Sequence, residues 1–173
     1  MELRHIAMVN WHLFDVEDIA IAGNAGILGE NASGKSTVLD MIQVVLTGAS
    51  RSYLRLNAIA GEGARTRSGS RRSVHGYCLG TLREGEFRRK DAFTYLSLGF
   101  ADRDGKRPPV SIGLALQASA SDSSETVYGR FVAIGRILTT KDFRNFTIDR
   151  LTGSAAAPKA RRVSAPAKPD TRE

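Results

Sequence analysis

The chain has 173 residues, 42% of them hydrophobic and 25% charged, which is typical of one globular domain with a sizeable core. Its formal net charge is +7, and its single cysteine, Cys78, excludes an internal disulfide and a multi-cysteine zinc site. No run of 18 apolar residues and no secretory leader pattern is present, so we expect a cytoplasmic protein with no membrane partner.

Three short segments with strand-like spacing open the chain, over residues 3–14, 16–22 and 25–28. Gly23 and Asn24 form a turn signal between the second and the third. The third segment leads directly into a glycine-bearing loop. We expect Trp11, in the first segment, to be a core residue.

A helix is predicted over residues 36–46, where apolar side chains recur at helical spacing before Gly48 stops the pattern. Residues 47–76 are rich in glycine, serine and arginine, and the sequence predicts no regular element there. Residues 49–109 hold 13 basic and 6 acidic side chains, which suits a polyanionic partner such as DNA. The alternative is a solvated basic loop with no such partner. The candidate DNA contacts are Arg65, Arg67, Arg71 and Arg72.

Three further strands are predicted over residues 92–101, 110–118 and 126–134. Asp104 and Gly105 form a hairpin-turn signal between the first two of these strands, so we expect the two strands to be antiparallel. We expect Arg88, Arg89 and Lys90, just before them, to form a solvated strand edge.

The last segment, residues 153–173, contains six alanines and three of the five prolines. Such a segment has little to bury, and we predict a disordered basic tail. The expected organisation is therefore a folded domain over residues 1–152 and a tail over residues 153–173.

The strongest motif lies between the third strand-like segment and the helix. It satisfies the pattern G-x-x-x-x-G-K-[ST] of a phosphate-binding loop, in the strand–loop–helix context that this pattern requires. The predicted nucleotide-binding residues are Gly29, Glu30, Asn31, Ala32, Ser33, Gly34, Lys35, Ser36 and Thr37.

Each fixed residue type in this pattern has a chemical role. Backbone N–H groups and the start of the helix attract phosphate oxygens. Lys35 supplies a cation for the β- and γ-phosphates, Ser36 supplies a hydroxyl ligand for Mg²⁺, and Thr37 adds a donor near the α-phosphate. The predicted cofactors are ATP and Mg²⁺.

The loop and the helix after it, with Leu39, Asp40, Ile42 and Leu46, resemble the N-terminal ATPase lobe of SMC-type chromosome-organising proteins. Ala32 stands where that family usually has glycine. The segments at residues 9–14, 72–77 and 89–95 are similar to those of the Wadjet anti-plasmid ATPase JetC and its MukB-like relatives. The resemblance covers roughly residues 1–150, and the loop is its most specific part.

The resemblance implies an α/β P-loop NTPase fold of the SMC/ABC head type with an antiparallel β portion. It also implies a second ATPase lobe or head that covers the nucleotide, system partner subunits, and DNA as the substrate of plasmid defence or chromosome organisation. The sequence holds no Leu-Ser-Gly-Gly signature and no apolar run ending in Asp-Glu, so we assign no catalytic residue and expect a truncated, catalytically incomplete fragment. The alternatives are a free-standing small P-loop kinase or NTPase, and a basic DNA-binding module with a vestigial loop.

Overall fold

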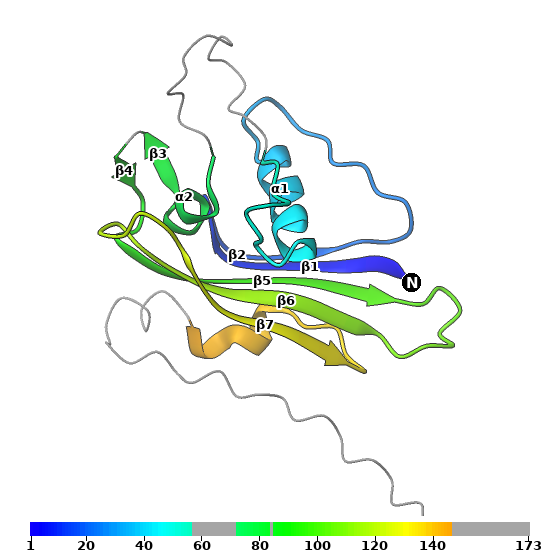
Figure 1. Ribbon diagram of the computed structural model, residues 1–173. Coiled ribbons are helices and arrows are strands. Elements are labelled where there is room, and N and C mark those ends of the chain that lie inside the picture. Colours follow the sequence, from blue (N-terminus) through cyan, green and yellow to red (C-terminus); the bar gives the residue numbers. More distant parts are fainter. Residues whose placement is uncertain (57–71, 84, 147–173) are drawn as a thin grey trace, which may run out of the picture.

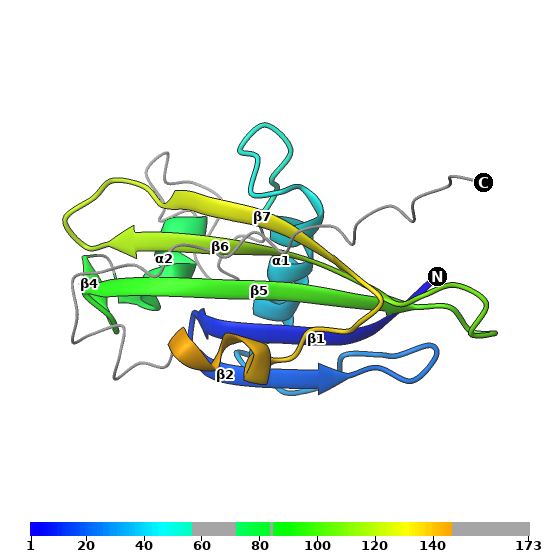
Figure 2. The same ribbon diagram turned by 90° about the horizontal axis from the view of Figure 1, so that it is seen from below.

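A five-stranded antiparallel sheet forms the centre of the computed structural model, which describes residues 1–56, 72–83 and 85–146. The strands lie in the order β2-β1-β5-β6-β7, and every neighbouring pair is antiparallel (Figure 2). These strands are β1 (Glu2–Trp11), β2 (Phe14–Ala20), β5 (Asp91–Ala101), β6 (Val110–Ser119) and β7 (Thr126–Ile134).

Helices cover both faces of this sheet. In Figure 1 the helices α1 and α2 lie above the sheet, and the 3-10 helix η1 lies below it. The remaining elements are α1 (Lys35–Leu46), α2 (Val74–Leu79), η1 (Thr140–Phe146) and a two-stranded sheet of β3 (Thr81–Arg83) and β4 (Glu86–Phe87). None of the helices in the described part of the chain is long and apolar enough to cross a membrane.

The larger core lies between the sheet and the helices α1 and α2. Alternate residues of a strand point to the same face, so Leu96 and Leu98 of β5 both face the helices. They are fully buried there with Met41 and Val44 of α1. A smaller cluster on the opposite face includes Val9 and the η1 residue Phe143. The sheet therefore carries α1 as a packed and fixed element.

The predicted antiparallel strands are confirmed. β5, β6 and β7 match the predicted segments within one residue at each end, and Gly105 adopts the positive φ of +66° that the hairpin turn needs. The predicted helix is also confirmed as α1. It ends at Leu46, two residues before Gly48, whose φ is +63°.

Three predictions about regular structure are wrong. Residues 25–28 form no strand; they pair with no strand of the sheet and lie exposed between β2 and α1. The first predicted strand divides at His12, whose φ is +53°, into β1 and β2. The segment predicted to be irregular contains the start of α2, which Ser73 caps by accepting a hydrogen bond from the Gly76 N–H.

Candidate nucleotide-binding site

The phosphate-binding loop connects an extended, exposed segment to the first turn of α1. In Figure 1 the chain rises from the end of β2, arches away from the sheet, and enters the top of α1. Three residues of the loop have positive φ, Gly29 at +159°, Ala32 at +66° and Gly34 at +94°. Such alternation of backbone conformation turns successive N–H groups toward one point and forms a concave anion site.

Gly34 is required at its position for two reasons. It is the N-cap of α1 in a left-handed conformation, which glycine adopts without a steric penalty. A Cβ added there would lie 2.9 Å from Cζ of Phe14, so the ring would have to move. Phe14, the first residue of β2, therefore supports the loop from below.

The start of α1 offers free amide donors. No side chain caps this helix, and the first backbone bond of the helix runs from the Val38 N–H to the Gly34 carbonyl. The N–H groups of Lys35, Ser36 and Thr37 precede that bond and have no acceptor within the helix, which is the arrangement that binds phosphate.

The Lys35 ammonium reaches back across the loop. Nζ donates to the carbonyl oxygens of Gly29 at 2.6 Å and Glu30 at 2.5 Å, and lies 3.5 Å from Oγ of Ser33. These bonds close the loop into a ring and hold the cation against its first two residues. The charge is therefore placed in advance of ligand binding, which lowers the cost of ordering on binding.

Ser36 and Thr37 differ in their surroundings. Within the described residues, the Ser36 hydroxyl makes no hydrogen bond and is partly exposed, so it fits the role of a Mg²⁺ ligand beside bound phosphates. Thr37 is only 3% exposed, and its carbonyl oxygen accepts a hydrogen bond of 3.0 Å from Nε1 of Trp11. The described residues contain no cluster of three or more His, Cys, Asp or Glu side chains that could hold a metal without the phosphates.

A buried polar network fixes α1 from the side of α2. The Tyr77 hydroxyl donates to Oδ2 of Asp40 at 2.5 Å, and Nη1 of Arg72 donates to the same hydroxyl at 3.0 Å. Burial, together with the hydrogen bond and charge of Asp40, raises the pKa of Tyr77, so the phenol stays protonated as the donor. The Tyr77 ring also packs 4.6 Å from that of Trp11.

The turn between β1 and β2 is held by two arginines. Arg88 donates to the Leu13 carbonyl and to Asp15, and Arg89 donates to the His12 carbonyl at 2.8 Å and also to Asp15. The prediction that these arginines form a solvated edge is wrong for Arg89, whose side chain is only 10% exposed. Sequence reasoning missed this clamp because the two sides of each contact lie more than 70 residues apart.

His12, in the same turn, remains uncharged at neutral pH. Burial lowers the pKa of His12, and the positive charges of Arg72 and Arg89 lower it further. Protonation of this ring would place a third cation beside two guanidinium groups.

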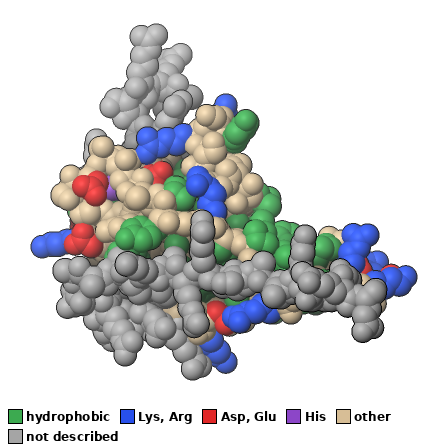
Figure 3. Space-filling model, turned by 60° about the horizontal axis from the view of Figure 1, so that its bottom comes forward, with side chains coloured by type: hydrophobic (Ala, Val, Ile, Leu, Met, Phe, Trp, Pro, Cys, Tyr) green, Lys and Arg blue, Asp and Glu red, His purple; other side chains and the backbone are tan. Residues whose placement is uncertain are grey.

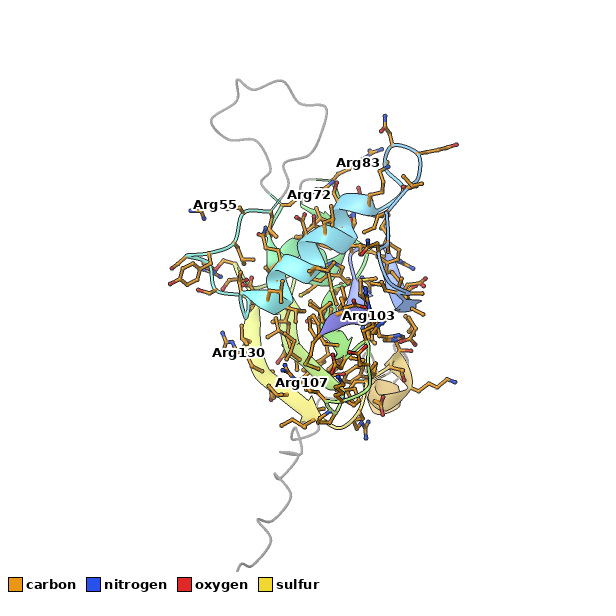
Figure 4. The ribbon with its side chains drawn as sticks, turned by 90° about the vertical axis from the view of Figure 1, so that its right-hand side faces the viewer. Arg55, Arg72, Arg83, Arg103, Arg107 and Arg130 are labelled. Atoms are coloured by element: carbon orange, nitrogen blue, oxygen red, sulfur yellow. The ribbon has the colours of Figure 1, made fainter. Side chains whose placement is uncertain are left out.

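The predicted DNA contacts are only partly located. Arg65, Arg67 and Arg71 lie outside the described residues. Arg72 lies beside α1 (Figure 4), and its side chain is 25% exposed with Nη1 3.8 Å from Asp40. The adjacent carboxylate offsets part of its charge.

The comparisons with known proteins agree with this geometry. Residues 3–63, about a third of the chain, match the family model described as the P-loop containing region of AAA domain. This match includes the whole predicted loop and α1. No curated protein matches the chain. The family match and the geometry of the loop together support a P-loop NTPase domain that binds a nucleotide.

Proposed function

We propose that this chain is the ATP–Mg²⁺-binding N-terminal half of an SMC-like ATPase head that acts on DNA, and that a second lobe completes its catalytic site. The observation that carries the proposal is the phosphate-binding loop, with Lys35 held by the carbonyls of Gly29 and Glu30 and free amides at the start of α1. These groups bind and orient phosphates. Mg²⁺ bound with ATP neutralises charge on the β- and γ-phosphates, and Ser36 is the residue that fits as its ligand.

The requirement for a second lobe is supported by apolar side chains that the described residues leave uncovered before the loop and along α1. Ile27 is 43% exposed and Leu28 is 92% exposed in the segment before the loop. On α1, Leu39 and Leu46 are 51% and 59% exposed and lie two helical turns apart on one side. A further layer of sheet or helix would bury such exposed apolar side chains.

Hydrolysis needs an oriented water and stabilisation of developing charge as well as a phosphate cradle. The chain supplies the cradle, whereas the sequence has no Asp-Glu pair after an apolar run and no Leu-Ser-Gly-Gly signature. We therefore propose that the isolated chain binds ATP–Mg²⁺ and hydrolyses it negligibly. The SMC-like assignment, and plasmid defence or chromosome organisation as its role, rest on the sequence resemblance.

Titration calorimetry with ATP–Mg²⁺ and a phosphate-release assay, on wild type and Lys35→Ala, test this proposal. Lys35→Ala should abolish ATP binding, because it removes the cation beside the β- and γ-phosphates. Its thermal unfolding should stay close to that of wild type, since the lost bonds join only exposed loop groups. Rapid turnover by wild type would indicate a free-standing NTPase, and DNA binding without any ATP binding would indicate a vestigial loop.

A further inference from the structure

Strand β7 is an open edge of the sheet. It is last in the strand order, with β6 on one side and no described strand on the other. At Gly129 within the strand and at Gly135 just after it, an added Cβ would meet no atom within 4 Å. An edge strand has outward N–H and C=O groups that can pair with another strand, and the nine-residue β7 offers them at alternate residues.

An apolar shelf runs along this edge on the face that carries α1. Val132 and Ile134 are two residues apart, so they point to the same side of β7, and they are 60% and 73% exposed. Their partners across β6 are Ile112 and Val110. Figure 3 shows hydrophobic side chains reaching the surface on the right half of the molecule, next to basic side chains.

Three arginines on the side of the molecule that carries the shelf have no carboxylate partner among the described residues. Nε of Arg130 in β7 donates to the Gly48 carbonyl at 3.0 Å, and Nη1 of Arg55 donates to the Leu54 carbonyl at 2.9 Å. Arg107 lies near the end of β7, because the Gly135 N–H donates to the Pro109 carbonyl at 2.7 Å. In Figure 4 Arg55 and Arg130 project from the same side of the molecule.

Backbone carbonyls orient two of these cations but do not neutralise them. The third, Arg107, is exposed. The edge therefore presents uncompensated positive charge beside alternating apolar side chains and unpaired backbone groups. A ligand that matches all three features is an extended peptide with carboxylates spaced between apolar residues.

We propose that β7 binds an extended acidic segment of a partner protein as an added antiparallel or parallel sixth strand. Pairing of two copies through β7 is disfavoured, because it would bring Arg55, Arg107 and Arg130 of both copies together in a chain of net charge +7. Double-stranded nucleic acid would satisfy the arginines but would leave the backbone groups and the apolar shelf unused. This inference does not depend on ATP binding.

The test uses the full chain and the synthetic nonapeptide Thr-Glu-Thr-Val-Thr-Val-Thr-Glu-Thr, whose glutamates and valines share one face of an extended strand, with hydrogen exchange as the readout. The peptide should slow exchange of the β7 amides that face away from β6, and an otherwise identical peptide with lysine in place of glutamate should not. Arg130→Glu should weaken peptide binding about tenfold or more, since it places like charges together. The matched control Arg83→Glu, on the exposed strand β3, should leave binding unchanged.

The apolar shelf is tested by Val132→Asn combined with Ile134→Asn, which should also weaken binding. Val16→Asn on the opposite edge strand β2, where Val16 is 51% exposed, is the control. The proposal would be overturned if the β2 control lost as much peptide binding as the shelf variant. It would also be overturned if the peptide protected β2 instead of β7, or if it did not bind. Three further results would overturn it. These are β7 amides that are already protected in the free chain, self-association through β7 that depends on concentration, and peptide binding that a DNA duplex displaces without any protection of β7.

Discussion

At the scale of single residues, Ala32 adopts a left-handed backbone conformation, with φ of +66°, inside the phosphate-binding loop. A residue with a Cβ pays roughly 1 kcal/mol more than glycine for this conformation. Ala32→Gly should therefore favour the binding-competent loop and strengthen ATP–Mg²⁺ binding by up to about fivefold, measured by calorimetry.

Ala49 provides the control for this substitution. It also has a positive φ, +57°, but lies beyond the end of α1 and away from the loop. Ala49→Gly should leave nucleotide affinity unchanged. Weaker binding in Ala32→Gly would mean that the alanine methyl contributes more to the loop than its backbone strain costs.

Tyr77 connects the two helices through one hydroxyl group. Tyr77→Phe removes the donor to Asp40, a carboxylate on a residue that is only 1% exposed. We expect the free energy of unfolding to fall by about 1–3 kcal/mol in denaturant titrations, the usual cost of removing a partner from a buried polar group. Tyr53→Phe, at a ring that is 73% exposed, should change stability little. An equal loss of stability in Tyr53→Phe would contradict a specific contribution from the Tyr77–Asp40 hydrogen bond.

At the scale of elements, η1 is attached to the sheet through Asp18 of β2. This carboxylate accepts from the Thr140 N–H at 3.0 Å, from the Thr140 hydroxyl and from Nε2 of His5 at 2.7 Å. Burial opposes ionisation of Asp18, but the hydrogen bonds from Thr140 and His5 outweigh it and lower the pKa of Asp18. Attachment of η1 therefore favours the ionised carboxylate.

The stabilisation from Asp18 should depend on pH in a defined direction. A lowered folded-state pKa means that the contribution is complete above the ordinary value of 3.8 and is lost as pH falls through the folded-state pKa. Because the group is partly exposed, we expect Asp18→Asn to cost less than about 1 kcal/mol near neutral pH. The difference in unfolding free energy between the two proteins should shrink in acid. If the difference in unfolding free energy grew in acid instead, the stabilisation could not come from ionised Asp18.

At the scale of the whole molecule, the net charge of +7 and the arginine-rich stretch predict DNA binding without sequence preference. With about 3–5 phosphate contacts, affinity should fall steeply between low and physiological salt. Anisotropy titrations on two unrelated duplexes measure this. Charge reversal at Arg65, Arg67, Arg71 and Arg72 should abolish binding, and binding that ignores salt or survives this reversal would refute the prediction.

The sequence correctly predicted features that depend on neighbours along the chain. Strands β5, β6 and β7 follow from alternating apolar residues and the turn at Gly105, and α1 follows from helical spacing that ends before Gly48. The loop motif was also recognisable, because its pattern requires glycine at fixed spacing followed by lysine, and the family match covers it. Trp11 is buried as predicted.

Contacts between distant segments were decided only by the tertiary structure. A strand requires a neighbour, so the apolar residues 25–28 form none in this sheet, and α2 has only six residues, too few to be stable without packing. Phe14 lies beneath Gly34, and Arg89 clamps the turn at His12, because the sheet brings these residues together. The sequence determined the phosphate-loop motif, since this motif resides in one continuous segment. The fold determined how that segment is supported and which edges and apolar surfaces stay open, since these depend on pairing across the sheet.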